Sequence, residues 1–445
     1  MIGEKDKMAN QVVKPSTLPG FIEWLPADQI AFNKMMDTIR KNYEKYGFIP
    51  VDTPVIEKSE VLLAKGGGDT EKQIYRFTKG DSDLSLRFDL TVPLARFVAQ
   101  HMSELTFPFR RYQIGKVYRG ERNQKGRFRE FYQCDIDIIG NGKLSIINDA
   151  EIPSIIYSTF TDLGFDSFTI HINNRKVLNG FFDAVGVENK VDTLRIVDKL
   201  DKIGIEAVKE ELKGLGLTDE SVARIEEFIN ITGSSDEVLE GLKKLNLDNE
   251  EFTLGLEELS KVVYYIRQFG VPDKNFMVDL KIARGLDYYT GTVYETILND
   301  YPGIGSVCSG GRYDNLAEYY TTQKLPGVGI SIGLSRLFYQ LKEAGFFKES
   351  VSSTLTKALV VPMDENVGYS IGVATELKKA GIASEVFFEE GKFVKKLNYA
   401  NKLGIPYVII IGGDEIASGV LTLKDMRSGE QFKLTVEEIL NKING

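Results

Sequence analysis

The hydrophobic and polar positions of this chain change their period along its length. An amphipathic helix is predicted over Asp28–Tyr46, because apolar side chains recur there every three to four residues. Gly47 ends this helix. From there to about Asn179, strand and turn patterns dominate, and two further helices are predicted near 93–101 and 148–163.

Residues 180–269 have a different character. They are rich in Leu, Glu and Lys, and Ser234 and Glu237 have the spacing of a capping box before a helical run. Strand-like sequence resumes at Asn275. We therefore predict a helical insertion over 180–269 within a discontinuous domain, whose two parts are 1–179 and 270–347.

The last part of the chain alternates between strand and helix patterns. Residues 348–357 are rich in Ser and Thr and are predicted to form a linker. Strands are then predicted at 358–361, 385–388 and 407–412, and helices at 367–380 and 393–403. This alternation is typical of a small α/β domain with a partly parallel sheet, here 358–445. The predicted fold class of the whole chain is α/β, of the α+β kind.

The segment 109–140 is predicted to be a long hairpin, because two runs of strand-forming residues flank Asn123–Gly126. Between Arg110 and Arg129 there are eight basic residues against the single acid Glu121, a local charge of +7 in a chain of net charge −9. A basic hairpin tip suits the binding of phosphates. An exposed hairpin that merely carries solvated charge is the alternative reading.

The return strand of this hairpin alternates between two faces. Tyr132, Cys134, Ile136 and Ile138 fall on the face predicted to be core, and Phe131, Gln133, Asp135 and Asp137 fall on the other. The second face offers an aromatic ring followed by polar side chains. Such a face suits a site that stacks a planar group and hydrogen-bonds a small cationic or amine-bearing ligand.

Composition limits the number of domains, the mode of nucleic-acid binding and the cellular compartment that we expect. The chain has 445 residues, enough for two or three domains, and its pI is about 5.2, which disfavours nonspecific nucleic-acid binding over the whole surface. Its two cysteines, Cys134 and Cys308, are far apart and are expected to be reduced and buried. No apolar run has the length of a signal peptide or a membrane span, so we expect a soluble, cytoplasmic protein.

Missing motifs constrain the chemistry as well. There is no GxxxxGK[ST] loop, and Gly327, Gly329 and Gly333 do not have the GxGxxG spacing, so side chains would have to hold the phosphates of any bound ATP. His101 and His171 are the only histidines. A histidine-based zinc site or a Ser-His-Asp triad is therefore improbable, both histidines are expected to be structural, and no metal ligand is assigned.

Five segments of the chain resemble the motifs of one family. YRGERNQKGRFREFYQCDID (118–137) resembles motif 2 of histidyl-tRNA synthetases, which are class II aminoacyl-tRNA synthetases. ARGLDYYTGTVYE (283–295) and CSGGRYDNL (308–316) resemble the histidine-specific motifs of that family. GVGISIGLSRL (327–337) resembles motif 3, and GFIPVDTPVI (47–56) resembles motif 1. Motif 2 indicates the class, and the RGLDYY and GGRYD pair narrows it to the amino acid.

The resemblance implies a fold and an activity. It implies an antiparallel catalytic sheet with a helical insertion and a C-terminal anticodon-binding domain. The expected activity joins histidine to the 3′ end of its tRNA through histidyl-adenylate, with ATP as substrate, pyrophosphate as product and Mg²⁺ as the expected ion. A homodimer is expected, because motif 1 lies at a two-fold interface in this family and Pro50 and Pro54 suit an edge strand.

Amino-acid activation brings two anions together, a carboxylate and the α-phosphate of ATP, so fixed guanidinium groups are needed to neutralise them. The resemblance implies that Arg119 and Arg284 bind the α-phosphate, that Arg284 also contacts the substrate carboxylate, and that Arg336 binds the γ-phosphate. Phe131 would stack on adenine. Glu121 and Arg127 would lie near the nucleotide.

The resemblance also assigns a histidine pocket. Asp137 and Tyr289 would contact the imidazole, and Asp89, Thr91 and Gln133 the α-amino group. The full set of expected histidine-binding residues is Asp89, Leu90, Thr91, Arg119, Gln133, Asp137, Arg284, Tyr288 and Tyr289. A site that pairs with both imidazole nitrogens rejects analogues that lack them.

Some positions depart from the family pattern or admit two readings. Asp89 and Asp137 stand where many bacterial relatives have glutamate, and Ser335 precedes the motif 3 arginine where an acid is common. Tyr288 and Tyr313 could equally be core aromatics. The two glycines of CSGGRYD either let backbone approach a ligand closely or form a tight turn.

Two other functions share the fold. A synthetase-like regulatory subunit of histidine biosynthesis would tend to lack the histidine motifs and the C-terminal domain, and this chain has both. A sensor of uncharged tRNA fused to a kinase would carry kinase motifs, which do not occur here. A histidine-dependent pyrophosphate exchange assay separates the three.

Overall fold

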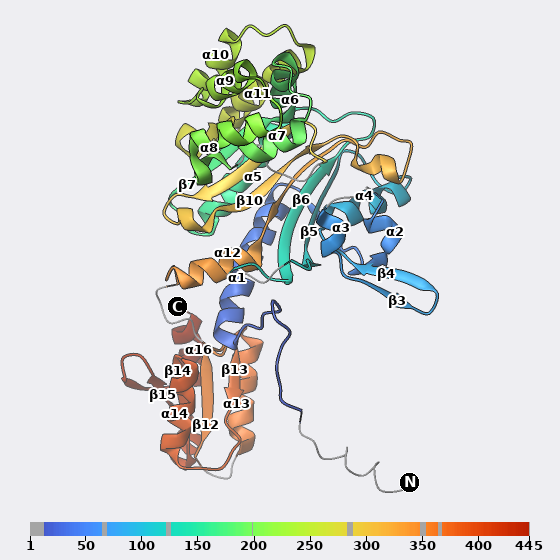
Figure 1. Ribbon diagram of the computed structural model, residues 1–445. Helices are drawn as coiled ribbons and strands as arrows, with labels where there is room; N and C mark the ends of the chain where they lie inside the picture. Colours follow the sequence, from blue (N-terminus) through green and yellow to red (C-terminus); the bar gives the residue numbers. More distant parts are fainter. Residues whose placement is uncertain are drawn as a thin grey trace. The chain divides into compact units, whose positions relative to one another are not determined.

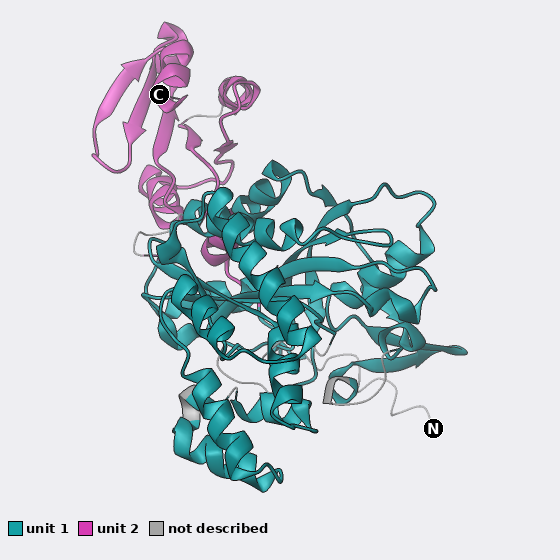
Figure 2. Ribbon diagram, turned by 90° about the horizontal axis from the view of Figure 1, so that it is seen from above, with its two compact units in different colours: residues 1–22, 35–346 teal, residues 23–34, 347–445 magenta. Residues whose placement is uncertain are grey.

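The computed structural model describes residues 13–64, 69–121, 126–197, 199–282, 288–347, 353–363 and 367–444 (Figure 1). The chain divides into two compact units, the first made of residues 1–22 and 35–346 and the second of residues 23–34 and 347–445 (Figure 2). Each unit is built around its own sheet. Part of the predicted hairpin tip, 122–125, and part of the predicted linker, 348–352, lie outside the described residues.

Helix α1, Pro26–Lys45, confirms the first predicted helix. Its buried side chains Phe32, Met35, Ile39 and Tyr43 follow the helical spacing. The helix belongs to both units, since the units divide between residues 34 and 35. In the first unit, the Tyr43 hydroxyl donates to the Cys134 carbonyl at 2.9 Å, which fixes the end of α1 against the strand that carries Cys134.

The described residues of the first unit form an eight-stranded sheet in the order β1-β5-β6-β11-β10-β9-β7-β8. Its central pairings are antiparallel, as expected, whereas β1 and β8 join the two edges in parallel. The strand bounds are β1 Ile49–Pro50, β5 Phe109–Tyr118, β6 Glu130–Ile139, β7 Phe168–Asn174, β8 Phe276–Val278, β9 Thr292–Leu298, β10 Ser306–Tyr313 and β11 Gly327–Ile332.

The predicted long hairpin is the pair β5 and β6, which are joined in register along ten residues each (Figure 1). The helix α5, Ile147–Asp162, follows this hairpin in the chain. Three of the four residues of the hairpin's predicted core face, Cys134, Ile136 and Ile138, are fully buried, whereas Tyr132 is half-buried. The opposite face is also largely buried, which the alternation alone did not predict. This second buried face carries the polar residues discussed below.

A long helical segment separates β7 from β8. The strand β8 nevertheless pairs with β7, so the sheet resumes after the helices, and the predicted capping box at Ser234 and Glu237 is confirmed at the start of α10. The helices gather at one end of the first unit (Figure 1). Their bounds are α6 Arg175–Ala184, α7 Lys190–Val197, α8 Leu200–Gly214, α9 Asp219–Ile229, α10 Ser235–Lys244 and α11 Glu250–Gln268.

We expected the segment 49–56 to be an apolar edge strand interrupted by Pro50 and Pro54, and the strand is shorter than expected. It forms only the two-residue β1 at the sheet edge, because Pro50 and Pro54 lack the N–H groups that a longer ladder needs. The chain then enters a small sheet of order β2-β4-β3. The remaining elements of this part are β2 Ile56–Lys58, α2 Ser59–Leu62, α3 Asp69–Gln73, β3 Arg76–Lys79, β4 Ser82–Leu86 and α4 Thr91–Gln100.

The described part of the second unit contains a five-stranded sheet of order β13-β12-β14-β15-β16. Its β12, β13 and β14 are parallel, as predicted, and β15 and β16 add an antiparallel edge. Apolar side chains fill both faces, with α13 and α16 packed on one face and α14 on the other. The bounds are β12 Ala358–Pro362, α13 Val367–Lys379, β13 Ser384–Val386, α14 Phe393–Leu403, β14 Tyr407–Ile411, α15 Gly413–Ser418, β15 Leu421–Asp425, β16 Gln431–Leu434 and α16 Val436–Asn444.

Three further findings concern expectations from composition. Cys134 and Cys308 are both buried and form no disulfide. His101 ends α4 with its Nδ1 3.3 Å from Glu104, and His171 Nδ1 lies 2.8 Å from Asp279 Oδ2, so both histidines have carboxylate neighbours. In the described part of the chain, every helix is too short or too polar to cross a bilayer.

Candidate active site

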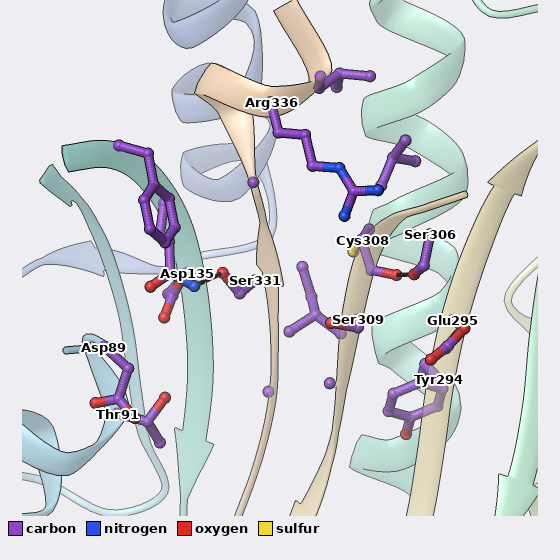
Figure 3. Close-up of a pocket in the computed structure, with 18 of the residues that line it drawn as sticks. Asp89, Thr91, Asp135, Tyr294, Glu295, Ser306, Cys308, Ser309, Ser331 and Arg336 are labelled. Atoms are coloured by element: carbon purple, nitrogen blue, oxygen red, sulfur yellow. Dashed lines mark hydrogen bonds between the residues drawn. The ribbon is translucent and has the colours of Figure 1, made fainter. Parts of the chain in front are cut away.

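A cavity of about 420 Å³ opens on the polar face of the first sheet. Its walls come from β6, β10 and β11, from the start of α4 and from the start of α12, Leu334–Glu343. In Figure 3, Arg336 reaches toward the strand of Cys308, while Asp89, Thr91 and Asp135 lie on the other side of the cavity. Segments far apart in sequence thus supply one site.

An aromatic and cationic group forms one wall of the cavity. The Arg119 guanidinium lies between two rings, 4.3 Å from the centroid of Phe88 and 5.1 Å from that of Phe131. Its Nε donates to the Phe88 carbonyl at 3.3 Å, and burial lowers its pKa although it stays cationic. Glu121 and Arg127 also line the cavity and lie 3.5 Å apart as an ion pair. A planar base and phosphates are the ligands that such a wall suits.

The floor of the cavity carries two buried carboxyl groups, Asp135 and Asp137, and the buried guanidinium of Arg111 lies beside Asp137 on the neighbouring strand β5. Asp137 Oδ1 accepts a hydrogen bond from the Tyr313 hydroxyl at 2.7 Å, and its Oδ2 lies 2.7 Å from Arg111. Burial raises the pKa of Asp135 to about 7 and that of Asp137 to about 6, although the Arg111 charge acts against both shifts. Carboxyl groups poised near neutral pH favour a ligand that brings N–H donors.

A third carboxyl group, Asp89, precedes α4. Its Oδ1 accepts from the Val92 N–H at 3.0 Å, so it caps the first turn, and burial raises its pKa. Thr91 is the first residue of the helix and lines the cavity beside Asp89. Leu90, which we expected among the histidine-binding residues, does not line the cavity. Its side chain is fully buried, and its carbonyl accepts from Arg111 at 3.1 Å.

Hydrogen bonds from serine side chains connect β6 to the motif 3 segment. The Gln133 side-chain amide donates to Ser331 Oγ at 2.7 Å, and Ser331 in turn bonds to the Asp135 carboxyl group. Ser335 is buried, and its Oγ accepts from the Tyr132 backbone N–H at 2.8 Å. At the position where an acid is common, Ser335 therefore ties α12 to β6, next to Arg336.

Three tyrosines close the cavity beside Asp137. The ring centroids of Tyr288 and Tyr289 are 4.9 Å apart, and those of Tyr288 and Tyr313 are 5.8 Å apart, both edge to face. Tyr288 bonds to Thr91, and burial raises the pKa of all three hydroxyls, so they remain neutral donors. Both readings of Tyr288 and Tyr313 hold, because these rings pack together and also line the cavity.

The glycines of CSGGRYD are not a tight turn, which was one of the two readings. Both lie within β10, and a side chain at Gly310 would lie 2.1 Å from the Gly329 carbonyl. At Gly329 itself, a side chain would lie 2.3 Å from Asp137 Oδ1. These positions lack side chains because two strands and the Asp137 carboxylate already fill the space.

The structure brings most of the predicted site residues into one cavity. Those that line it are Asp89, Thr91, Arg119, Glu121, Arg127, Phe131, Gln133, Asp137, Tyr288, Tyr289 and Arg336. Arg284 lies outside the described residues. The Arg336 guanidinium donates to the Ile304 carbonyl at 2.8 Å.

Sequence reasoning gave no individual role to several residues of the site. Asp135, Ser309 and Ser331 line the cavity, and Arg111 lies beside Asp137 on the neighbouring strand. Asp135 was placed on the correct face by the period of two, and that alternation was the available signal. Ser309 and Ser331 face Asp135 only because β10 and β11 pair next to β6, which the local pattern does not encode.

Among the described residues, no group of three His, Cys, Asp or Glu side chains is arranged to hold a metal ion. Two carboxylates that line the cavity, Glu121 and Glu295, are separate from the group on the floor. One or two carboxylates together with substrate phosphates are the usual setting for Mg²⁺. The donor set fits an ion that arrives with a nucleotide.

Comparisons with known proteins agree with this geometry. A family model described as histidyl-tRNA synthetase matches residues 20–337, and one described as anticodon binding domain matches residues 357–445. The chain is 65% identical over 436 residues to a histidine–tRNA ligase of Clostridium tetani, with 98% of this chain and 99% of that protein covered. It is 52% identical to the enzyme of the same name from Clostridium acetobutylicum, covering 97% and 100%. The crystal structure of histidyl-tRNA synthetase from Nostoc sp. PCC 7120 matches at a TM-score of 0.90 and 43% identity, covering 97% and 99%.

Proposed function

Because the chain belongs to the histidyl-tRNA synthetase family, we propose that its cavity is the place where histidine and ATP react. The protein is a histidine–tRNA ligase, and the comparisons favour this function over a regulatory subunit or a tRNA sensor. The observation that carries the assignment of the site is the convergence of Arg119, Arg336 and three buried carboxyl groups on one cavity.

Activation joins the histidine carboxylate to the α-phosphate and releases pyrophosphate. In our proposal Arg119 neutralises charge at the α-phosphate, since its guanidinium is held in place by Phe88 and Phe131 before ATP arrives. Phe131 stacks on adenine, and Glu121 and Arg127 lie beside the nucleotide. Arg336 contacts the γ-phosphate from α12. Arg284 keeps its expected role at the α-phosphate and the substrate carboxylate.

The floor of the cavity binds histidine. Asp89, Thr91 and Gln133 receive the α-amino group, and Asp137 and Tyr289 lie at the imidazole. The acidic floor favours the substrate cation. Because these polar groups are buried, a ligand that lacks an N–H donor leaves them without partners, and this is the physical basis of rejection.

Magnesium is expected to enter with the phosphates of ATP. Glu121 and Glu295 are the cavity carboxylates that would hold it, and its charge would neutralise the phosphate oxygens. Removal of Mg²⁺ by a chelator should stop adenylate formation while histidine binding continues, and calorimetric titration with histidine alone measures the second part.

A homodimer is proposed from the sheet edge. The edge strand β1 has two residues, and the side chains of Ile49, Val55 and Ile56 along this segment are 53%, 37% and 47% exposed. Light scattering at micromolar concentration should report twice the chain mass of 49.9 kDa. A particle of one chain mass contradicts the proposal.

The second unit is proposed to bind the anticodon side of the tRNA, within the predicted domain 358–445. A chain that ends near Ser350 should still form histidyl-adenylate, since every candidate catalytic residue precedes the cut, but it should aminoacylate tRNA poorly. Full-rate aminoacylation by this shortened chain would assign the unit another task. The cytoplasmic setting expected from the sequence is part of this proposal.

Histidine-dependent pyrophosphate exchange tests the function as a whole. Purified protein with ATP and Mg²⁺ should exchange pyrophosphate only when histidine is added. Arg284→Ala should lower this exchange by about two to three orders of magnitude with a smaller change in histidine affinity. Exchange with another amino acid, or none with histidine, contradicts the proposed function.

A further inference from the structure

The carboxyl oxygens of the cavity floor differ in whether they have a hydrogen-bond or ion-pair partner within the protein. Asp137 Oδ1 accepts from the Tyr313 hydroxyl at 2.7 Å, and Oδ2 lies 2.7 Å from Arg111, close enough for an ion pair although not aligned as a hydrogen bond. Asp89 Oδ1 caps α4 through the Val92 N–H. These two carboxylates therefore have protein partners before a substrate binds.

Asp135 is occupied on one side only. Ser331 lies beside Asp135 (Figure 3). Its Oγ accepts a hydrogen bond from Gln133 and lowers the pKa of the Asp135 carboxyl group, so its single hydrogen is available to Asp135. Among the described residues, Asp135 Oδ1 and Gln133 Oε1 are buried and have no hydrogen-bond partner. Both residues line the cavity and are two positions apart on the same face of β6. Asp137 Oδ2 also accepts no hydrogen bond from a described residue, but it is ion-paired with Arg111. Within the described part of the chain, Asp135 Oδ1 and Gln133 Oε1 are therefore the two neighbouring floor acceptors with neither kind of partner.

Buried acceptors without donors are costly, so their position points to a ligand. Arg111 also has two unpartnered nitrogens, Nε and one terminal nitrogen, but Arg111 does not line the cavity and Asp135 does. A ligand in the cavity can therefore reach Asp135. The substrate of this site offers two kinds of N–H donor, the α-amino group and the imidazole ring, and Gln133 is already assigned to the first.

We propose that Asp135 is a specificity-determining residue of the histidine site, and that its open carboxyl oxygen accepts a hydrogen bond from an imidazole N–H. Asp137, held by Tyr313 and Arg111, keeps its proposed position at the imidazole as a second carboxylate beside the ring. This inference rests on the proposed function. It adds a residue that recognises the imidazole side chain of the substrate.

The first test compares substrates in pyrophosphate exchange. Asp135→Asn keeps the shape of the side chain and removes the anion, so the KM for histidine should rise about 10- to 100-fold while the KM for ATP changes by less than about twofold. β-(2-Thiazolyl)alanine has a ring nitrogen but no ring N–H. The preference of the wild-type protein for histidine over this analogue should fall at least about tenfold in the variant.

Glu57→Gln is the matched control. Glu57 is a buried carboxylate that pairs with one arginine, Arg96, and does not line the cavity. Glu57→Gln also replaces a buried carboxylate by an amide, so thermal stability should fall. The preference for histidine over the analogue should stay unchanged. A second variant, Ser331→Ala, keeps the Asp135 carboxyl group and removes its hydrogen-bond donor, and we expect a smaller loss of preference.

A second test uses proton release. Burial raises the pKa of Asp135 to about 7, and an imidazole N–H would favour its carboxylate form, so binding should release a proton from this group. Calorimetric titration with histidine at pH 7 in buffers of different ionisation enthalpy should show about half a proton more released by the wild-type protein than by Asp135→Asn. The titratable groups around Asp135 that act on the same equilibrium are Arg111, Arg119, Asp137, Asp89, Tyr289, Tyr43, Cys134 and Cys308.

The outcomes separate this inference from the proposed function. If wild-type exchange depends on histidine but Asp135→Asn keeps the wild-type KM, preference and proton release, Asp135 is structural and the inference is wrong. If wild-type exchange does not depend on histidine, the proposed function fails first. If Asp135→Asn does not fold, Ser331→Ala decides: because Ser331 lowers the pKa of Asp135, its removal leaves more of this carboxyl group protonated at pH 7, and histidine binding should then release more protons than in the wild-type and Glu57→Gln proteins. Equal proton release by all three proteins overturns the inference.

Discussion

The two sheets of this molecule use their faces differently. In the second unit, apolar clusters fill both faces of the five-stranded sheet, and helices cover each of them. In the first unit, one face of β6 is equally apolar, but the other buries Gln133, Asp135 and Asp137 at 9%, 2% and 3% exposure. Burying neighbouring carboxyl groups opposes folding, so the comparison teaches that this face is kept for binding rather than for packing.

The largest expected effect tests whether basic residues of one hairpin are equivalent. Arg119→Ala should lower adenylate formation by about two to three orders of magnitude, because it removes a guanidinium placed before ATP arrives. Arg110→Ala is the control, since Arg110 also belongs to the hairpin but pairs with Glu151 at 2.8 Å outside the cavity. Pyrophosphate exchange should be nearly unchanged there. Equal losses of exchange in both variants would contradict a special role for the arginine that lines the cavity.

A second prediction concerns how the stability of each unit depends on pH. The raised pKa of Asp135, about 7, means that the folded first unit binds more protons than the unfolded chain between about pH 4 and 7, so this group opposes folding increasingly as the pH rises. Asp135→Asn should stabilise the ligand-free protein by about 1–3 kcal/mol at pH 8 and have little effect at pH 4. Denaturant unfolding at the two pH values measures this.

The second unit should respond in the opposite sense. Lys433 and the hydrogen bonds from Thr422 and Gly412 lower the pKa of Glu415 to about 2. The stabilisation from Glu415 is therefore complete above about pH 5 and is lost as the pH falls toward 2. Glu415→Gln should reduce the stability of this unit at pH 7 and not at pH 2. A variant that loses the same stability at both values would contradict the assignment.

The smallest expected effect concerns the apolar faces, which should behave alike. Ile136 in β6 and Ile409 in β14 are both fully buried. Ile136→Val and Ile409→Val should each cost about 0.5–1.5 kcal/mol in the free energy of unfolding, because each removes one methylene group from a packed face. Chemical denaturation measures both. A cost at Ile136 several times larger would show that the apolar face of β6 also supports the site.

Local patterns predicted much of the fold. The periods of α1, of the β5–β6 hairpin and of β12 to β14 were readable, since each element carries its own alternation of apolar and polar residues. The shortness of β1 was not foreseen, although Pro50 and Pro54 were visible in the sequence. The strand β15 and the edge strand β16 were also not predicted. In β16, Gln431–Leu434, the apolar positions are only half-buried.

Site residues that lie together in one sequence motif were predicted. Site residues that become neighbours only through strand pairing were missed. Arg119, Phe131 and Asp137 lie in one motif, and the cavity contains all three. The importance of Asp135 depends on Ser331, which is almost two hundred positions away in sequence and becomes its neighbour only when β11 pairs with β6. Arg111 was counted among the basic residues of the hairpin, but it is fully buried beside Asp137. Burial of this kind is a property of the assembled sheet and cannot be read from one strand.

Helix α1 has a consequence for the order in which the protein folds during synthesis. Residues 23–34 belong to the same unit as residues 347–445, so more than 300 positions are translated between the two parts. At about 5–20 residues per second, the ribosome needs roughly 15–60 s to reach the later part. During that interval Trp24 and Phe32, whose rings stack at 6.2 Å in the finished unit, lack most of their unit. Near its beginning the nascent chain therefore carries two aromatic side chains that cannot complete their packing until its end emerges.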